Sequence, residues 1–195
     1  MSEDGVPFAN AEAWEAWLAE HHADSDGIWV KFAKNASGIP TIVYKEAVHE
    51  ALRYGWIDGH TKRVDDDWYI QRFTPRRARS RWSKINCAKA EALIASGAMQ
   101  PAGLAEVERA KADGRWDAAY DAPSTATVPA DLRAALDRDR AASELFEKLD
   151  SQNRYAILHR LQDAKKPETR VRRIEKFVAM LSRGETIYPP RRAAR

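Results

Sequence analysis

The chain has 195 residues and a net charge of +3, with seven tryptophans and a hydrophobic content of 44%. This length is enough for one large domain or two small ones, each with its own core. The single cysteine, Cys87, excludes an intrachain disulfide and a cysteine-based zinc site. No apolar run reaches the roughly 18 to 20 residues that a membrane-spanning helix needs.

Charge is unevenly distributed along the chain. Residues 1–122 carry 16 Lys and Arg against 19 Asp and Glu, whereas residues 123–195 carry 16 against 10. The C-terminal part is therefore the basic one, and the sequence pI near 9.0 slightly favours a polyanionic partner. The acidic N-terminal segment, MSEDGVPFANAEAW, lacks the positive and apolar regions of a secretory signal, so we expect a cytoplasmic protein.

Helices and strands alternate in the first part of the chain. Asn10 can cap the first helix, and Gly55 is well placed to end the second. Apolar spacing predicts helices over residues 11–22 and 44–54 and strands over residues 28–34, 39–43, 61–64 and 68–73. The last two strands form a predicted hairpin whose turn holds three aspartates.

Helices are predicted through the rest of the chain. Ser83 and Ser151 can each cap one, and prolines at 101, 129 and 167 fit helix starts. Residues 121–128, DAPSTATV, have the composition of a linker. We therefore expect an α+β fold in which a small, mostly antiparallel sheet with packed helices (1–122) precedes a helical domain (123–188) and a disordered tail (189–195).

Residues 55–86, GWIDGHTKRVDDDWYIQRFTPRRARSRWSKIN, are the best candidate for a functional site. Arginine and aromatic side chains together suit a planar or phosphorylated ligand. A helix that begins after Ser83 would add free N–H groups for an anion. The predicted ligand-binding residues are Trp56, Asp58, Arg72, Phe73, Arg76, Arg77, Arg81, Trp82 and Lys84. A solvated basic loop explains the same composition equally well.

The acidic residues of this stretch leave alternatives open. Asp65–Asp67 have the chemistry of a Mg²⁺ ligand, but a solvated hairpin tip is the more common explanation. Asp58 and His60 form a potential acid/base pair, although Asp-Gly is also an ordinary turn dipeptide. If Asp58 is partly buried, it needs a cationic partner such as Arg72.

The common catalytic and cofactor motifs are absent from the sequence. It contains no GxGxxG, GxxxxGK[ST], HExxH or GxSxG pattern, so we predict neither a metal nor a cofactor. The last helix has a basic polar face formed by Arg170, Arg172, Arg173, Lys176 and Arg183. A solvated amphipathic helix is the favoured interpretation, with a nucleic-acid or anionic-membrane surface as the alternative.

Several segments resemble the YdeI/OmpD-associated, or bacteriocin-protection, family over nearly the whole chain. They are WLAEHHADSDGIWVKFAK, GWIDG, QRFTPRRARSRWSKIN and KKPETRVRRIEKFVAML. The resemblance implies an N-terminal α+β part, a C-terminal helical domain and a link to protection from bacteriocins or antimicrobial peptides. It implies no catalytic residues. Val43 stands where similar proteins often have a capping Thr, and His60 where they often have a Gln-like residue.

Three functions are consistent with these patterns. The leading hypothesis is a cytoplasmic stress or bacteriocin (antimicrobial-peptide) protection protein that binds an unidentified anionic or aromatic small ligand through the Trp/Arg-rich site. The second is a nucleic-acid-binding protein that uses residues 72–84 and the basic C-terminal helices. The third is a small-molecule enzyme with Asp58 as its general acid or base. The sequence does not indicate an oligomeric state.

Overall fold

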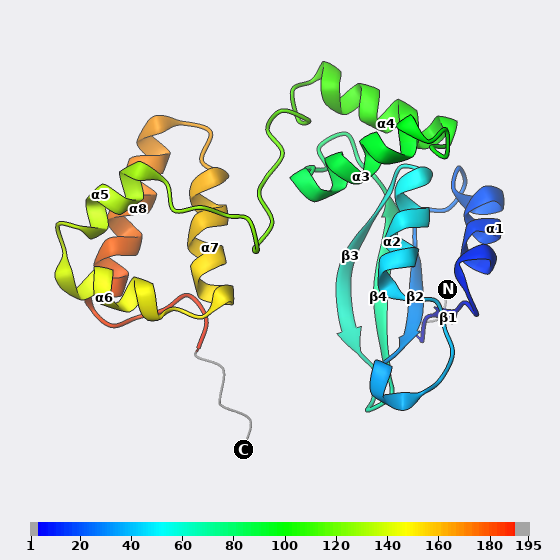
Figure 1. The fold of residues 1–195 in the computed structure, drawn as a ribbon, viewed down its shortest axis with the longest axis horizontal. Coiled ribbons are helices and arrows are strands. Elements are labelled where there is room, and N and C mark those ends of the chain that lie inside the picture. Colours follow the sequence, from blue (N-terminus) through cyan, green and yellow to red (C-terminus); the bar gives the residue numbers. More distant parts are fainter. Residues whose placement is uncertain (1–3, 190–195) are drawn as a thin grey trace. The chain divides into compact units, whose positions relative to one another are not determined.

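The computed structural model describes residues 4–189, which form two compact units, one ending at Ala119 and the other beginning at Tyr120 (Figure 1). The first unit combines a sheet with helices. In the second, helices are the regular elements of the described residues. The predicted α+β class is therefore confirmed. Of the tail predicted to be disordered, residues 190–195 lie outside the described residues.

The first unit is built on a sheet with the strand order β1-β2-β4-β3. β1 runs parallel to β2, and the other neighbouring strands are antiparallel. A short 3₁₀ turn at Asn35–Ser37 follows β2. The elements are β1 (Val6–Pro7), α1 (Ala11–His21), β2 (Ile28–Ala33), α2 (Tyr44–Arg53), β3 (Trp56–Arg63), β4 (Trp68–Pro75), α3 (Lys84–Ala95) and α4 (Pro101–Ala112).

The predicted strand over residues 39–43 is wrong. This segment is irregular and is held by single contacts: Thr41 Oγ1 accepts the N–H of Ala33 at 3.1 Å, and the N–H of Ile42 donates to the carbonyl of Phe8 at 3.0 Å. Pro40 lacks the N–H that a regular ladder would use. The segment therefore crosses from the sheet to α2 without adding a strand.

β3 is longer than predicted. It begins at Trp56 rather than at residue 61, and its register with β4 shifts between Asp58 and Thr61. A β-bulge at this point inserts one extra residue into β3 and changes the direction of the strand. The Asp-Gly dipeptide, which suggests a turn in the sequence, therefore lies inside a strand.

α1 and α2 cover one face of the sheet (Figure 1). Trp14 is fully buried there, and its Nε1 donates to the carbonyl of Ala47 at 3.1 Å, which ties the two helices together. Asn10 caps α1 as predicted, since its Oδ1 accepts the N–H of Ala13 at 3.0 Å. Val43 offers no acceptor at the start of α2, but Glu46 Oε2 accepts the N–H of Val43 at 3.2 Å, so half of a capping box forms.

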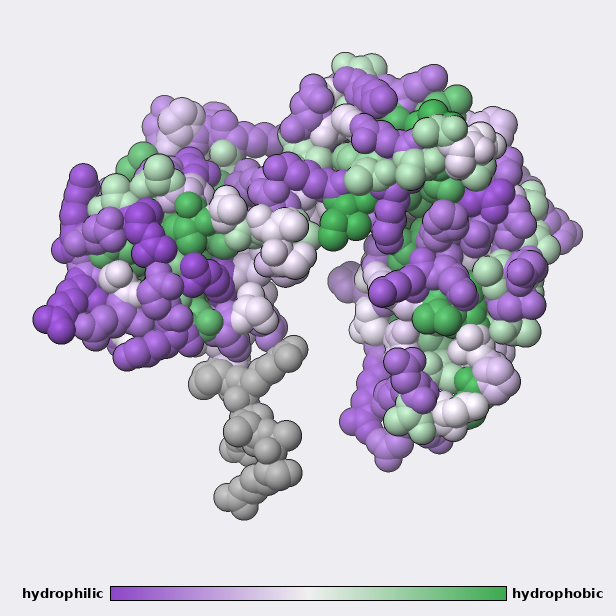
Figure 2. Space-filling model, in the orientation of Figure 1, coloured by the Kyte–Doolittle hydropathy of each residue, from purple (hydrophilic) through white to green (hydrophobic). Residues whose placement is uncertain are grey.

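The second unit packs its helices around a separate core. Asp150, rather than Ser151, caps α7, because its Oδ1 accepts the N–H of Asn153 at 2.7 Å. Figure 2 shows hydrophilic residues over much of the visible surface of each unit, with smaller groups of hydrophobic residues between them. None of the helices within residues 4–189 is long and apolar enough to cross a membrane. The elements are α5 (Ala130–Leu136), α6 (Arg140–Lys148), α7 (Ser151–Gln162) and α8 (Pro167–Ser182).

Candidate functional site

The three aromatic residues of the predicted Trp/Arg-rich site are core residues. Trp56 and Trp82 are each 1% exposed, and Phe73 is fully buried. Trp56 and Phe73 belong to the core beneath α1 and α2, and Trp82 packs with α3 and α4. The prediction that these rings stack on a ligand must therefore be corrected, because none has a face open to solvent.

Arg76 has a structural role in the basic loop that follows β4. Its guanidinium is buried and lies 3.7 Å from the centre of the Trp82 ring, and its Nη1 donates to the carbonyl of Arg81 at 3.0 Å. Arg115 fastens the same loop, since its Nη1 donates to the carbonyl of Ser80 at 2.7 Å. Arg76 therefore supports the loop from inside instead of offering a charge to a ligand.

Asp58 and Arg72 lie on opposite faces of the sheet. The hydroxyl of Tyr44 donates to Asp58 Oδ2 at 2.7 Å, and Gln71 Nε2 lies 3.5 Å from the same oxygen. Arg72 instead lies beside Trp29 on the other face. The expected Asp58–Arg72 partnership is therefore wrong, and neutral hydrogen-bond donors satisfy this carboxylate.

The remaining predicted residues lie at the exposed start of α3. Arg77, Arg81 and Lys84 are exposed, and Ser83 caps the helix by accepting the N–H of Asn86 at 3.2 Å. The loop thus brings cations near a helix N-terminus, as predicted. Since the rings of Trp56, Phe73 and Trp82 are buried, they do not provide the stacking surface that the predicted site requires.

Asp65–Asp67 form the turn of the β3–β4 hairpin. Asp65 Oδ1 accepts the N–H groups of Asp67 and Trp68, both at 2.8 Å, and the bond from Asp67 is the main cause that lowers the pKa of Asp65. Within residues 4–189, no group of three or more His, Cys, Asp or Glu residues is arranged to hold a metal ion. The side chain of Asp65 therefore shapes the turn.

Cys87 lies in the first turn of α3 with its thiol buried. Burial raises the pKa of Cys87 to about 11. At neutral pH the thiolate fraction should then be roughly 300-fold smaller than for an exposed cysteine with a pKa of about 8.5. We expect Ellman's reagent to label the native protein correspondingly slowly and the urea-unfolded protein at the ordinary rate. Fast labelling of the native protein would contradict this.

The basic face of α8 is largely engaged within its own unit. Arg170 forms two hydrogen bonds with the carboxylate of Asp131, at 2.5 and 2.9 Å, and thereby lowers the pKa of Asp131. Arg173 lies 3.8 Å from Asp163, and Arg183 lies 2.9 Å from Glu185. These ion pairs favour the interpretation of α8 as an ordinary amphipathic helix.

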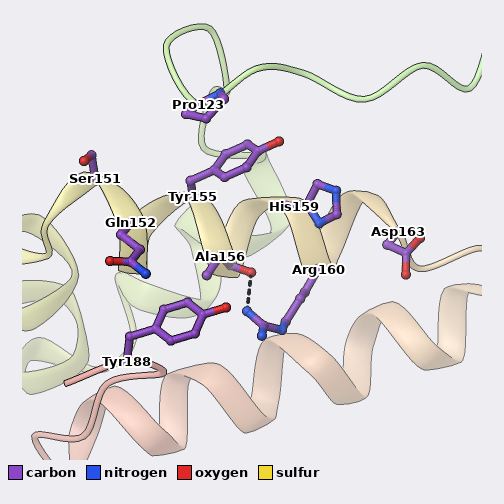
Figure 3. Close-up of a pocket in the computed structure, with 9 residues that line it drawn as sticks. All are labelled: Pro123, Ser151, Gln152, Tyr155, Ala156, His159, Arg160, Asp163 and Tyr188. Carbon is purple, nitrogen blue, oxygen red and sulfur yellow. Dashed lines mark hydrogen bonds between the residues drawn. The ribbon is translucent and has the colours of Figure 1, made fainter. Parts of the chain in front are cut away.

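An open hollow of about 600 Å³ lies along α7 (Figure 3). The residues of α7 that line the hollow recur at every fourth position. Positions four apart lie on the same side of a helix. Pro123, which precedes α5, and Tyr188, which follows α8, complete the lining. The two rows on α7 are Ser151, Tyr155, His159 and Asp163, and Gln152, Ala156 and Arg160.

Both walls of the hollow are held by side chains of α7. Asn153, which is buried, donates to the carbonyl of Tyr188 at 3.2 Å and accepts its N–H at 2.9 Å. On the other wall, the hydroxyl of Tyr155 donates to the carbonyl of Asp121 at 2.9 Å, and the Gln162 amide contacts the same residue twice at 3.1 Å. These contacts within the unit therefore hold both walls of the hollow in place.

Arg160 connects this hollow to a second one. Its Nη1 donates to the carbonyl of Ala156 at 3.1 Å (Figure 3), and its guanidinium carbon lies 5.9 Å from the centre of the Tyr188 ring. Arg160 and Asp163 also line the second hollow, of about 500 Å³, together with Arg173, Lys176, Phe177, Met180 and Ile187. An aromatic hollow thus adjoins a basic one.

Sequence reasoning missed this site. Tyr155 has the spacing of a core residue, and the two walls lie about 30 residues from α7 along the chain in either direction. The four-residue recurrence of polar and aromatic side chains along α7 is the one pattern that indicates it. The fold and the hollow define the class of protein: an α+β unit followed by a helical unit with an open hollow along α7.

Two family models match the chain. A domain of unknown function (DUF8412) matches residues 6–106, and the bacteriocin-protection, YdeI or OmpD-associated model matches residues 125–184. The chain belongs to the DUF8412 family, and its C-terminal match confirms the resemblance to bacteriocin-protection proteins. That match is confined to the second unit, whereas the sequence resemblance suggested nearly the whole chain. No curated protein and no solved structure matches the chain.

Proposed function

We propose that the chain is a non-catalytic cytoplasmic binding protein in stress or bacteriocin (antimicrobial-peptide) protection, and that its ligand is a small molecule with a planar ring and an anionic group. The proposal rests on Arg160, which stands where the aromatic hollow meets the basic one. Most of the hollow's lining falls within residues 125–184, the segment that matches the bacteriocin-protection model.

The chemistry of the lining supports this ligand class. Tyr155, His159 and Tyr188 offer ring surfaces for a planar group. Arginine recognises carboxylate and phosphate groups through paired hydrogen bonds, and Arg160 is already oriented by Ala156 and Tyr188. A volume of about 600 Å³ falls within the usual range for small-molecule sites.

The charge around Arg160 also favours an anion. The second hollow contributes Arg173 and Lys176, and its carboxylate, Asp163, lies 3.8 Å from Arg173. The lining of this hollow thus contains three cationic side chains and one carboxylate, which pairs with Arg173. A ring bound against the aromatic side chains would place an attached phosphate or carboxylate toward this basic side.

The test is an NMR titration of the full chain with four probes. Adenosine monophosphate and salicylate combine a ring with an anionic group. Adenosine has the ring alone, and inorganic phosphate has the negative charge alone. We expect the two combined probes to shift the backbone amides of α7 and of residues 185–189. Adenosine and phosphate should each bind at least about tenfold more weakly.

Arg160→Gln should weaken binding of the combined probes by about tenfold or more, since hydrogen bonds to charged groups contribute roughly 1.5–3 kcal/mol. Arg154→Gln is the matched control. Arg154 belongs to the same helix, but its guanidinium lies over Phe146 and pairs with Glu147, outside the hollow. Undiminished binding in Arg160→Gln, or no shifts with either combined probe at millimolar concentration, would refute the proposal.

A further inference from the structure

The face of the sheet opposite α1 and α2 carries tryptophan and basic side chains. Side chains alternate between the two faces of a strand, so every second residue of β2 and β4 belongs to this outer face. None of the hydrophobic clusters formed by the described residues includes Trp29 or Trp68. The outer face comprises Trp29, Lys31, Lys62, Trp68, Ile70 and Arg72.

Each tryptophan on this face is accompanied by cations. Lys62 Nζ lies 4.7 Å from the centre of the Trp29 ring, and Arg72 Cζ lies 6.0 Å from it. Lys31 Nζ lies 4.9 Å from the centre of the Trp68 ring. Both tryptophans are only half-buried. The indoles therefore lie at the surface beneath long side chains that can rotate aside.

The three strands that form the outer face carry more basic than acidic side chains. Asp58 is the one acidic residue in the sequences of β2, β3 and β4, and it belongs to the other face, where Tyr44 donates to it. Among the described residues, the carboxylate that pairs with Arg72 is that of Asp26, which is 3.8 Å away and 93% exposed. Such an exposed pair contributes little, so Arg72 remains available to another anion.

The spacing of the two tryptophans indicates an extended ligand. Trp29 pairs with Arg72 across the strands, and Ala33, four residues further along β2, pairs with Trp68. Four residues of a strand span about 14 Å. Lys31 and Ile70 pair midway between them, and Ile70 is buried there beside Gly5, whose Cβ in an alanine would lie 2.6 Å from Ile70 Cγ2. One ring cannot cover both tryptophans, but a chain with a repeating ring and a repeating negative charge can.

We propose that this outer face binds single-stranded nucleic acid. Bases would stack on Trp29 and Trp68, while Lys31, Lys62 and Arg72 turn from the rings to the phosphates. Stacking on aromatic side chains together with backbone neutralisation is the general mode by which proteins hold single strands. This surface is separate from residues 76–84 and from the hollow along α7, so the proposal does not depend on the proposed function.

The experiment is fluorescence anisotropy of the full chain with a fluorescein-labelled 20-nucleotide single strand, as DNA and as RNA. Trp29→Leu/Trp68→Leu keeps apolar cover but removes the rings, and should weaken binding by at least about tenfold. Trp29→Phe/Trp68→Phe retains rings and should keep most of the affinity. Circular dichroism confirms that both variants fold.

The salt dependence tests the cations separately. Lys31→Ala/Lys62→Ala should reduce the slope of log affinity against log salt by about 1.4, since each phosphate contact with a single strand contributes about 0.7. Arg63→Ala is the control, because it removes a positive charge from β3, the strand that contains Lys62. Arg63 pairs with Asp66, and it lies opposite Tyr69, whose side chain packs against the core. Its slope should equal that of the wild type.

Four results would overturn the proposal. They are the absence of binding at about 50 mM salt, equal affinity for duplex DNA, unchanged affinity in the Trp→Leu pair, and binding to phosphatidylglycerol vesicles without binding to the oligonucleotide. The last result would assign the face to an anionic membrane instead.

Discussion

Replacing Gly103 with alanine should destabilise the first unit by about 3 kcal/mol or more, at the upper end of overpacking effects. A Cβ at this buried position would lie 2.1 Å from the carbonyl oxygen of Arg53 and 2.6 Å from the sulfur of Met99. Met99 is flexible, but the Arg53 carbonyl is fixed because it accepts the N–H of Gln100 at 3.2 Å. The end of α2 and the start of α4 would therefore have to separate.

Urea unfolding followed by tryptophan fluorescence measures this effect directly, because all seven tryptophans precede residue 120. The matched control is Ala105→Gly, an exposed position on the same helix, which should cost about 1 kcal/mol through helix propensity alone. Propensity alone would make Gly103→Ala stabilising by a similar amount. A stabilised Gly103→Ala variant would therefore show that α2 and α4 are not in close contact.

Local sequence rules predicted the helices of this protein well. Caps and prolines act within one turn, so Asn10, Ser83 and Pro101 locate the starts of α1, α3 and α4 without knowledge of the rest of the fold. β3 was harder to predict, since its first half contains Asp58-Gly59. Pairing with β4, in which Phe73 lies opposite Asp58, turns an apparent turn into a bulged strand.

The candidate site illustrates a different limit of sequence reasoning. Composition shows that residues 55–86 are rich in aromatic and basic side chains. It does not show on which face of the sheet each side chain lies. Arg72 and Phe73 are neighbours in the chain, yet one belongs to the outer face and the other is fully buried in the core. Register decides this, and register depends on pairing with β2. Arg77 of this stretch is therefore exposed at the surface, whereas Arg76 and the rings of Trp56, Phe73 and Trp82 are buried.

Replacing Asn153 with alanine should destabilise the second unit by about 2 kcal/mol and release the segment around Tyr188. The buried amide joins three groups: it donates to Asp150 Oδ1 at 3.0 Å and to the carbonyl of Tyr188 at 3.2 Å, and it accepts the N–H of Tyr188 at 2.9 Å. Alanine leaves the N–H of Tyr188 without this acceptor, which costs roughly 1–3 kcal/mol, partly relieved when the segment moves into water. Asp150 Oδ1 keeps the backbone N–H of residue 153, and the Tyr188 carbonyl keeps the hydroxyl of Thr186.

Hydrogen exchange at the Tyr188 amide is the most direct measurement of this release, with circular dichroism in urea for stability. Exchange should accelerate to the rate of an unprotected amide in Asn153→Ala, while the helices of the unit stay protected. The control is Gln152→Ala, an exposed neighbour, whose stability should stay within about 0.5 kcal/mol of the wild type. Since Tyr188 forms one wall of the hollow, Asn153→Ala should also weaken binding of adenosine monophosphate. If Tyr188 stays protected in Asn153→Ala, another contact holds this wall, and Asn153 does not act as its clamp.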